Sequence, residues 1–192
     1  MKKIWIFVLA LMLISFGCEQ PNKKDDSKES AEKPLKNNNE LKAMDIGTLK
    51  SGLGMEGKEE GGQFKVTIPQ NDLNVMVDGF KIIPPMGLGS WAAFAPTSAQ
   101  TMVMGDIVVT EKDLKPVQQE IIQQGLTVTA IHNHFVRNEP DVMYMHIGGM
   151  GSEEKLAKSL KAIFDKVTEI RGADPSAVEM SSVENTLDTK RI

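Results

Sequence analysis

The chain has 192 residues, a formal net charge of −4 and a single cysteine. A mildly acidic chain without a basic stripe interleaved with aromatic residues lacks the electrostatics of nucleic-acid binding, and one cysteine excludes a disulfide framework. The length suffices for one domain of ordinary size with additional segments.

The first 17 residues have the pattern of a signal peptide. Lys2 and Lys3 precede an apolar run from Ile4 to Phe16, which is too short to span a bilayer comfortably as a mature helix. Cys18 follows directly and resembles the lipidated, palmitate-bearing cysteine of a bacterial lipobox in its looser form. The pattern predicts an exported protein held at the cell membrane or envelope by lipid on Cys18, and a free thiol in an ordinary signal peptide is the alternative.

The next stretch has mixed charge, no aromatic residue and too few apolar residues for a core, which predicts a disordered tether. We therefore divide the chain into a signal peptide at 1–17, a lipidated cysteine and tether at 18–44, a folded domain at 45–171 and a polar tail at 172–192.

Strand patterns dominate the first half of the folded domain. A short helix that ends at a glycine is predicted after Asp45. Alternating apolar residues over 63–69 and 73–77 predict strands, and Asp78-Gly79 predicts a tight hairpin into residues 80–83. The small, apolar stretch at 86–96 is either a strand that buries its two aromatic residues or a loop folded over the site.

The second half alternates strands with two helices. Residues 102–109 predict a strand, and the helix after it is predicted to have Asp113 as N-cap and a buried stripe of Val117, Ile121 and Ile122. This order up to residue 134 allows a parallel crossover. A second helix is predicted after Ser152. Together these patterns predict an α+β fold, in which a mixed, largely antiparallel sheet carries two helices.

Glycines crowd the stretch just before the second helix. Residues 148–151 read Gly-Gly-Met-Gly, which predicts a turn that joins strand and helix. A loop whose backbone N–H groups hold an anion is the alternative.

All three histidines lie between residues 131 and 151. His132 and His134 are two residues apart in a β-favouring run, so a strand there projects both imidazoles from one face of a sheet. His146 lies in a second strand-like run, and the polar segment at 136–140 can turn the chain back as a hairpin. We expect the three rings to converge on one divalent metal ion, zinc above all.

The register of this hairpin decides whether the rings can meet. Residues directly opposite in an antiparallel pair share a face, so His146 joins the others only if paired residue numbers sum to an even value, as with His132 opposite Tyr144. Three neutral nitrogen ligands with a fourth position left open to water are typical of catalytic zinc. A structural or hydrogen-bonding histidine cluster is the alternative.

Copper is the alternative metal, because Met143 and Met145 flank His146 and thioethers suit soft ions. The tight Met-x-Met arrays are this pair and Met102 with Met104. Methionine is also an adaptable core residue, so the pattern alone does not separate the two uses.

Longer phrases of the chain resemble the LppY/LpqO group of bacterial lipoproteins, which share a domain of unknown function. The phrases extend over roughly residues 45–171 and read FKVTIPQNDLNVMVDGFKI, GLGSWAAFAP, MVMGDIVVTEKDLKPV, GLTVTAIHNHFVRNEPDVMYMHIGGMG and KLAKSLKAIFD. The resemblance implies secretion and lipid anchoring, with one copy of a domain that members often carry twice. It implies no established activity.

A second resemblance concerns the site alone. The His-x-His pair with a third histidine on a following strand is similar to the zinc motif of acetolactate decarboxylases and their fold relatives, some of which are zinc-dependent ester hydrolases. This resemblance implies zinc rather than copper and identifies no substrate.

Proton transfer beside a metal needs further groups, and the hairpin loop offers Arg137 and Glu139 as candidate catalytic residues. Arg137 can clamp a carboxylate and Glu139 can activate metal-bound water, or both can be solvated charges at a hairpin tip. Tyr144 can contribute its hydroxyl or simply pack. Asp106 and Glu111 are candidates more distant in the sequence.

Two function classes follow from these patterns. The first is a metal-dependent enzyme on a small carboxylate or ester substrate, and the second is a non-catalytic lipoprotein that binds metal or a ligand for sensing, delivery or storage. An enclosed pocket with Arg137 or Glu139 directed into it favours the enzyme, and an exposed, methionine-lined site favours binding. Partners are expected to be the membrane, through the lipid, and a small-molecule ligand, without nucleic acid.

Overall fold

The computed structural model of the protein describes residues 40–172 and Asp174. The predicted signal peptide, Cys18, and nearly all of the predicted tether and C-terminal tail lie outside these residues. Within the described part of the chain, no helix has the length and apolar character needed to cross a bilayer.

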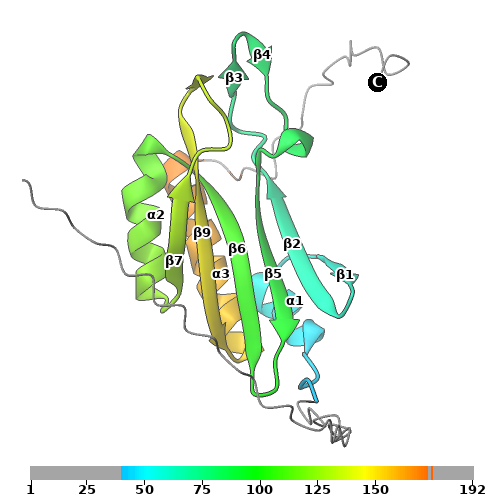
Figure 1. Ribbon diagram of the computed structural model, residues 1–192. Helices are drawn as coiled ribbons and strands as arrows, with labels where there is room; N and C mark the ends of the chain where they lie inside the picture. Colours follow the sequence, from blue (N-terminus) through cyan, green and yellow to red (C-terminus); the bar gives the residue numbers. More distant parts are fainter. Residues whose placement is uncertain (1–39, 173, 175–192) are drawn as a thin grey trace, which may run out of the picture. The chain divides into compact units, whose positions relative to one another are not determined.

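The described residues form three α-helices, a six-stranded sheet and a small three-stranded sheet, which confirms the predicted α+β class (Figure 1). In chain order the elements are α1 (Ile46–Leu53), β1 (Lys58–Glu60), β2 (Gln63–Pro69), β3 (Met76–Val77), β4 (Phe80–Lys81), the 3₁₀ helix η1 (Pro84–Met86), β5 (Gly89–Pro96), β6 (Thr101–Thr110), α2 (Glu111–Gln123), β7 (Thr127–His132), β8 (Asn138–Glu139), β9 (Val142–Gly151) and α3 (Glu153–Arg171).

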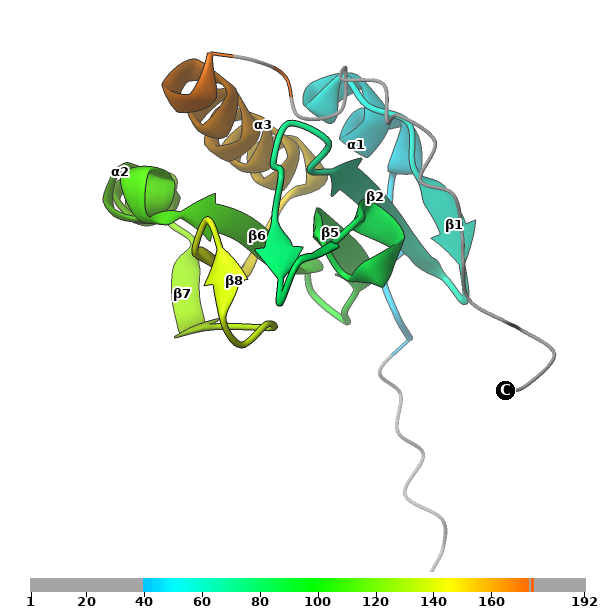
Figure 2. The same ribbon diagram turned by 90° about the horizontal axis from the view of Figure 1, so that it is seen from above.

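The three helices cover one face of the six-stranded sheet (Figures 1 and 2). Its strand order is β1-β2-β5-β6-β9-β7, and each neighbouring pair of described strands is antiparallel. The opposite face carries exposed side chains along most of its length, and we call it the open face. A second, smaller core under β3 and η1 covers one end of it, where Val108 and Tyr144 are buried.

Strand alternation explains the covered face. In β6 and β9 the alternate residues Val103, Ile107, Met145 and Ile147 belong to the main core together with residues of all three helices. Full burial of one such side chain contributes about 1.5 to 3 kcal/mol. The residues between them in sequence therefore project from the open face.

Helices α1 and α3 begin at the residues that the sequence predicts, and α1 ends at a glycine as predicted. The Asp45 carboxylate accepts a hydrogen bond from the Thr48 N–H at 3.0 Å, and Gly54 ends α1 in the left-handed conformation that favours glycine. Ser152 caps α3 in the predicted way by accepting from the Lys155 N–H at 3.3 Å.

Two predictions about α2 were wrong. Its N-cap is Thr110, and Asp113 lies at the third helical position, where it accepts from the Thr110 N–H at 2.8 Å to complete a capping box. Ile122 is 60% exposed, and of the predicted stripe only Val117 and Ile121 are buried.

The predicted parallel pairing of the strands before and after α2 was also wrong. Strands β6 and β7 run in the same direction, but β9 lies between them and pairs antiparallel with both. The glycine run at 148–151 belongs to β9 rather than to a loop. A Cβ atom at Gly149 would lie 2.4 Å from a terminal carbon of the Leu126 side chain, so a larger residue there would displace that side chain.

The structure shows which residues of the segments 86–96 and 73–77 form strands. Residues 86–96 end in strand β5, which buries Phe94, while Trp91 stays partly exposed with the Lys65 Nζ 4.5 Å from its ring centroid. The predicted strand at 73–77 is a strand only at Met76–Val77, which pairs with β4 across the predicted Asp78-Gly79 turn.

Candidate metal centre

Strands β6, β7 and β9 bring the histidines and one acid to the open face. Asp106 lies opposite His146 in the β6–β9 ladder, and His132 lies opposite Tyr144 in the β7–β9 ladder. The second pairing has the even sum that the sequence required, so His132 and His146 share a face. His134 follows two residues after β7 ends.

The imidazole rings meet in space. The centroids of His132 and His146 are 4.4 Å apart, and those of His132 and His134 are 4.9 Å apart. The Nε2 atoms of His132 and His134 are separated by 3.0 Å. Two neutral nitrogens at this distance need either a proton or a cation between them. The structure thus places the His134 and His146 rings on either side of His132, and the binding of one ion by all three stays a prediction.

Asp106 adds a carboxylate to the cluster. Its Oδ2 lies 3.4 Å from Nε2 of His146 and 3.7 Å from Nε2 of His134. The residue is only 2% exposed, and its Oδ1 atom has no hydrogen-bond partner among the described residues. A buried carboxylate is costly unless a cation or hydrogen-bond donors compensate it.

These distances fit a metal ion. Zinc bonds of 2.0 to 2.2 Å in a tetrahedron place neighbouring ligand atoms about 3.3 to 3.6 Å apart. The measured separations of 3.0, 3.4 and 3.7 Å lie around this value. Asp106, His132 and His134 each offer a ligand atom within 4.8 Å of the others, so this group of three can hold a metal ion. His146, the third predicted ligand, lies outside that group but within 3.4 Å of Asp106. Asp106, which the sequence offered only as a distant candidate, thus joins the site directly.

Tyr144 packs against the histidine cluster. Its ring stacks on His134 with centroids 3.4 Å apart and planes at 14°, and its hydroxyl donates to the Gly87 carbonyl at 2.9 Å. Burial raises the pKa of this fully buried phenol, as does the nearby charge of Asp106. Of the two predicted roles for Tyr144, the structure supports packing, because the hydroxyl is engaged away from the histidines.

The electrostatics favour a neutral His134. Burial lowers the pKa of this imidazole below its ordinary value, and the Asp106 carboxylate opposes that shift in part. A neutral imidazole is the form that binds a metal ion.

The methionines that flank His146 do not reach the site. Met145 is fully buried in the main core and Met143 packs against that core, so both side chains project from the covered face. Met143 and Met145 therefore supply no thioether to the histidine cluster and do not favour copper there.

Arg137 lies in the loop between β7 and β8, and its side chain is directed to the β3–β4 turn. Its Nε donates to Asp78 Oδ1 at 3.0 Å, and this bidentate pair lowers the pKa of the Asp78 carboxyl. The Arg137 side chain is 70% exposed. The contact joins two loops, and a catalytic role for Arg137 stays a prediction.

Glu139 is exposed in β8 opposite Met76, and together with Glu111 it lines a hollow at the start of α2. The structure thus brings these two predicted candidates together, in a hollow whose lining contains none of the three histidines. A catalytic role for Glu139 also stays a prediction.

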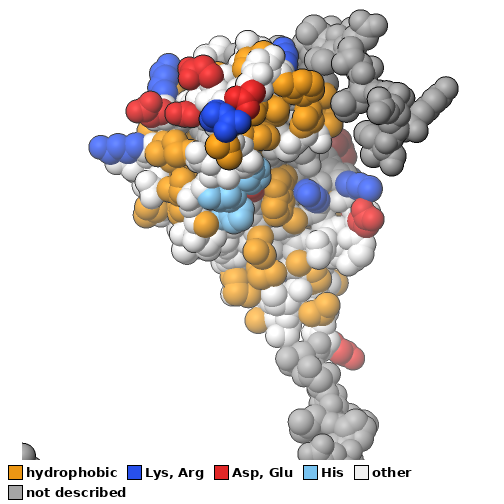
Figure 3. Space-filling model, turned by 45° about the horizontal axis from the view of Figure 1, so that its top comes forward, with side chains coloured by type: hydrophobic (Ala, Val, Ile, Leu, Met, Phe, Trp, Pro, Cys, Tyr) orange, Lys and Arg blue, Asp and Glu red, His pale blue; other side chains and the backbone are white. Residues whose placement is uncertain are grey.

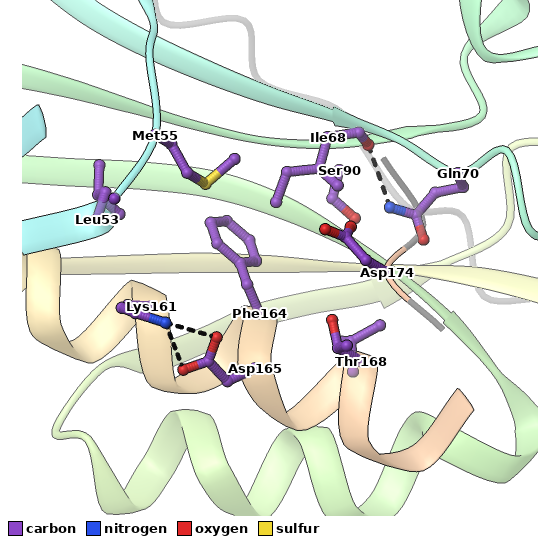
Figure 4. A pocket seen from close by; sticks show the side chains of 12 residues that line it. Leu53, Met55, Ile68, Gln70, Ser90, Lys161, Phe164, Asp165, Thr168 and Asp174 are labelled. Carbon is purple, nitrogen blue, oxygen red and sulfur yellow. Dashed lines mark hydrogen bonds and ion pairs between the residues drawn. The ribbon is translucent and has the colours of Figure 1, made fainter. Parts of the chain in front are cut away.

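A further hollow of about 270 Å³ lies beside α3 (Figure 4). Leu53, Met55 and Phe164 give it an apolar lining, and Lys161 pairs with Asp165 at its edge at 2.8 Å. No histidine lines it, so the hollow is separate from the metal centre.

The metal centre faces solvent. The side chains of His134 and His146 are 35% and 44% exposed. Figure 3 shows the histidines gathered at the surface with hydrophobic side chains around them. The cluster is thus an open surface site with a buried acid at its base.

Sequence reasoning had one signal for Asp106 that it did not use. The residue is the sole charge within an otherwise apolar strand, Thr101–Thr110. A charged side chain at such a position is rarely buried without a partner. The identity of that partner, however, depends on the β6–β9 register, which no local pattern contains.

The comparisons with known proteins give a family and no activity. The family model described as Domain of Unknown Function (DUF1259) matches residues 47–166, which is more than half of the chain. The chain therefore belongs to this family. Searches of curated proteins and of solved structures gave no match.

Proposed function

We propose that this member of the DUF1259 family binds one zinc ion through Asp106, His132, His134 and His146, in a protein exported and anchored to the cell envelope by lipid on Cys18. The observation that carries the proposal is the buried Asp106 carboxylate, whose Oδ1 atom has no partner among the described residues while its Oδ2 faces two imidazoles. A divalent cation there compensates the buried charge.

Four protein donors favour binding over catalysis. Structural zinc sites are closed by four protein ligands, whereas catalytic sites retain three and keep a position for water. With Asp106 in the set, the fourth position predicted for water is taken by the protein. Arg137 is held by Asp78, and Glu139 lines a different hollow, so neither supports proton transfer at the metal. We therefore favour a non-catalytic role in metal sensing, delivery or storage over hydrolysis of an ester.

Zinc is favoured over copper by the donor set. Imidazole and carboxylate ligands are common in zinc sites, and the flanking thioethers are buried on the covered face. The sequence resemblance to acetolactate decarboxylase-type zinc proteins supports the same metal, and that to LppY/LpqO lipoproteins supports the envelope location.

Titration of the full chain with zinc against a competing chelator tests the metal proposal. We expect one equivalent to bind, and we expect Asp106→Ala and His132→Ala each to remove most of the affinity. Asn133→Ala is the matched control, since this exposed residue lies between two of the ligands in the chain and should bind zinc as the wild type does. Stoichiometric zinc in a His132→Ala/His146→Ala double variant would refute the site.

Fractionation of cells tests the anchoring proposal. Cys18→Ala should move the protein to the soluble fraction or leave the precursor unprocessed, because the lipid chains provide the attachment. Unchanged membrane attachment together with an unchanged mass would show that Cys18 carries no lipid.

A further inference from the structure

Three methionines lie together on the open face, beyond the metal centre. Met102 is directly opposite Met150 in the β6–β9 ladder, and Met104 is the next residue along β6 that shares this face. Asp106 and His146 follow as the next pair on the same face. The Met-x-Met array at 102–104 thus gains a third thioether from a strand distant in sequence.

The ladder brings the three side chains within reach of one ion. Directly opposite residues have Cβ atoms about 4.5 to 5.5 Å apart, and diagonal neighbours about 7 to 8 Å. Methionine has three rotatable bonds, so its sulfur can adjust over such distances. Gly148 lies opposite Met104 and has no side chain that would separate Met104 from Met150.

Two of these methionines are unusually exposed to solvent. Met104 is 55% exposed and Met150 is 49% exposed, although methionine is usually a core residue. Figure 3 shows hydrophobic side chains continuing over this face below the histidines. Exposed apolar clusters mark a site of contact with a partner or a ligand.

We propose that Met102, Met104 and Met150 form a second metal site, which binds a soft monovalent cation, copper(I) or its analogue silver(I). Thioether sulfur is a soft ligand that suits copper(I), whereas the usual zinc ligands are thiolate, imidazole and carboxylate groups. The cluster is uncharged, which suits a cation of single charge better than a divalent one. The site shares no residue with the zinc centre and does not depend on it.

The test is a competition titration of the full chain with copper(I), held by bicinchoninate under reducing conditions after zinc saturation. The wild type should bind one equivalent. Met104→Leu/Met150→Leu should weaken binding more than about 100-fold, because loss of a mere supporting group already costs metal sites about 10- to 100-fold. Leucine keeps the volume and apolar character of methionine, so folding and any apolar contact surface are retained.

Two controls separate this site from others. Met86→Leu changes another exposed methionine, 47% exposed in η1, and should bind copper(I) like the wild type. His132→Ala/His134→Ala should lose zinc and keep copper(I). Equal copper(I) affinity of the wild type and the Met104→Leu/Met150→Leu variant would overturn the proposal, and so would loss of copper(I) only in the histidine variant.

Methyl-labelled methionine NMR with silver(I) gives a second readout. The methyl signals of Met102, Met104 and Met150 should shift with one equivalent, and that of the buried Met145 should not. Shifts confined to other methionines would contradict the assignment.

Discussion

The two faces of the six-stranded sheet have different tasks, although they are made by the same strands. Met145 and His146 are consecutive in β9, yet the first is fully buried under the helices and the second is 44% exposed beside Asp106. The same division separates Ile107 from Asp106 in β6. The covered face maintains the fold, and the open face carries polar and soft donor groups.

The division follows from strand geometry. A one-residue change of register would exchange the faces, so the packing of the covered face also fixes the positions of the donors on the open face. The packing of the main core therefore holds Asp106 and the histidines in place, although these residues do not belong to that core. Substitutions on the two faces should accordingly affect different measurements.

The largest effect should come from the covered face. Ile107→Ala removes a fully buried side chain from the main core and should lower the free energy of unfolding by about 2 to 5 kcal/mol. Met104→Ala, on the open face of the same strand, should change it by about 0.5 kcal/mol or less. Urea denaturation of the metal-free protein measures the free energy of unfolding of both variants. Equal losses of this free energy would contradict the proposed difference between the two faces.

Asp106→Asn should produce the reverse pattern. Loss of a ligand should weaken zinc binding by at least about 100-fold. The metal-free protein should be no less stable than the wild type, because the substitution removes a buried charge without a fixed cation. A destabilised variant that binds zinc normally would show that Asp106 is a structural residue instead.

The smallest effect concerns pH. The pKa of His134 is lowered in the folded protein, chiefly by burial, so the unfolded chain binds more protons as pH falls through about 6.5. Metal-free stability should therefore decrease slightly below this pH, and the effect is small because the side chain is 35% exposed. Zinc affinity should fall more steeply there, because protons compete for the imidazoles.

The pH dependence of zinc affinity can be measured by chelator competition, and that of metal-free stability by urea denaturation, between pH 8 and pH 5. His134→Gln should remove the pH dependence of metal-free stability that this residue contributes. A stability that rises as pH falls through the same range would contradict the assigned direction of the His134 pKa.

Much of the fold could be predicted from local patterns in the sequence. Period-two alternation located β2, and capping residues located α1 and α3, because these signals depend on neighbours in the chain. Parity gave the condition under which His132 and His146 share a face. The even register that meets this condition arises only after a β-bulge between Val128 and Ala130, which the local pattern did not predict.

One error was local: Asp113 is suitable as an N-cap, but Thr110, three residues before it, is the N-cap, and the capping box between them could have been predicted from the sequence. The remaining features depend on contacts between distant residues, such as the Arg171 Nε that lies 2.6 Å from Asp113 Oδ2. The insertion of β9 between β6 and β7 cannot be read from the order of elements. That insertion is also what brings Asp106 to His146, so the sequence indicated three candidate ligands and the topology added Asp106 as a fourth candidate.

Anomalous diffraction at the zinc absorption edge, from crystals of the zinc-loaded protein, tests the central claim most directly. We expect one anomalous peak on the open face, about 2.0 to 2.2 Å from a carboxylate oxygen of Asp106 and from Nε2 of His132, His134 and His146. A peak held by other residues, or an Asp106 carboxylate that is hydrogen-bonded within the protein and distant from the metal, would contradict it.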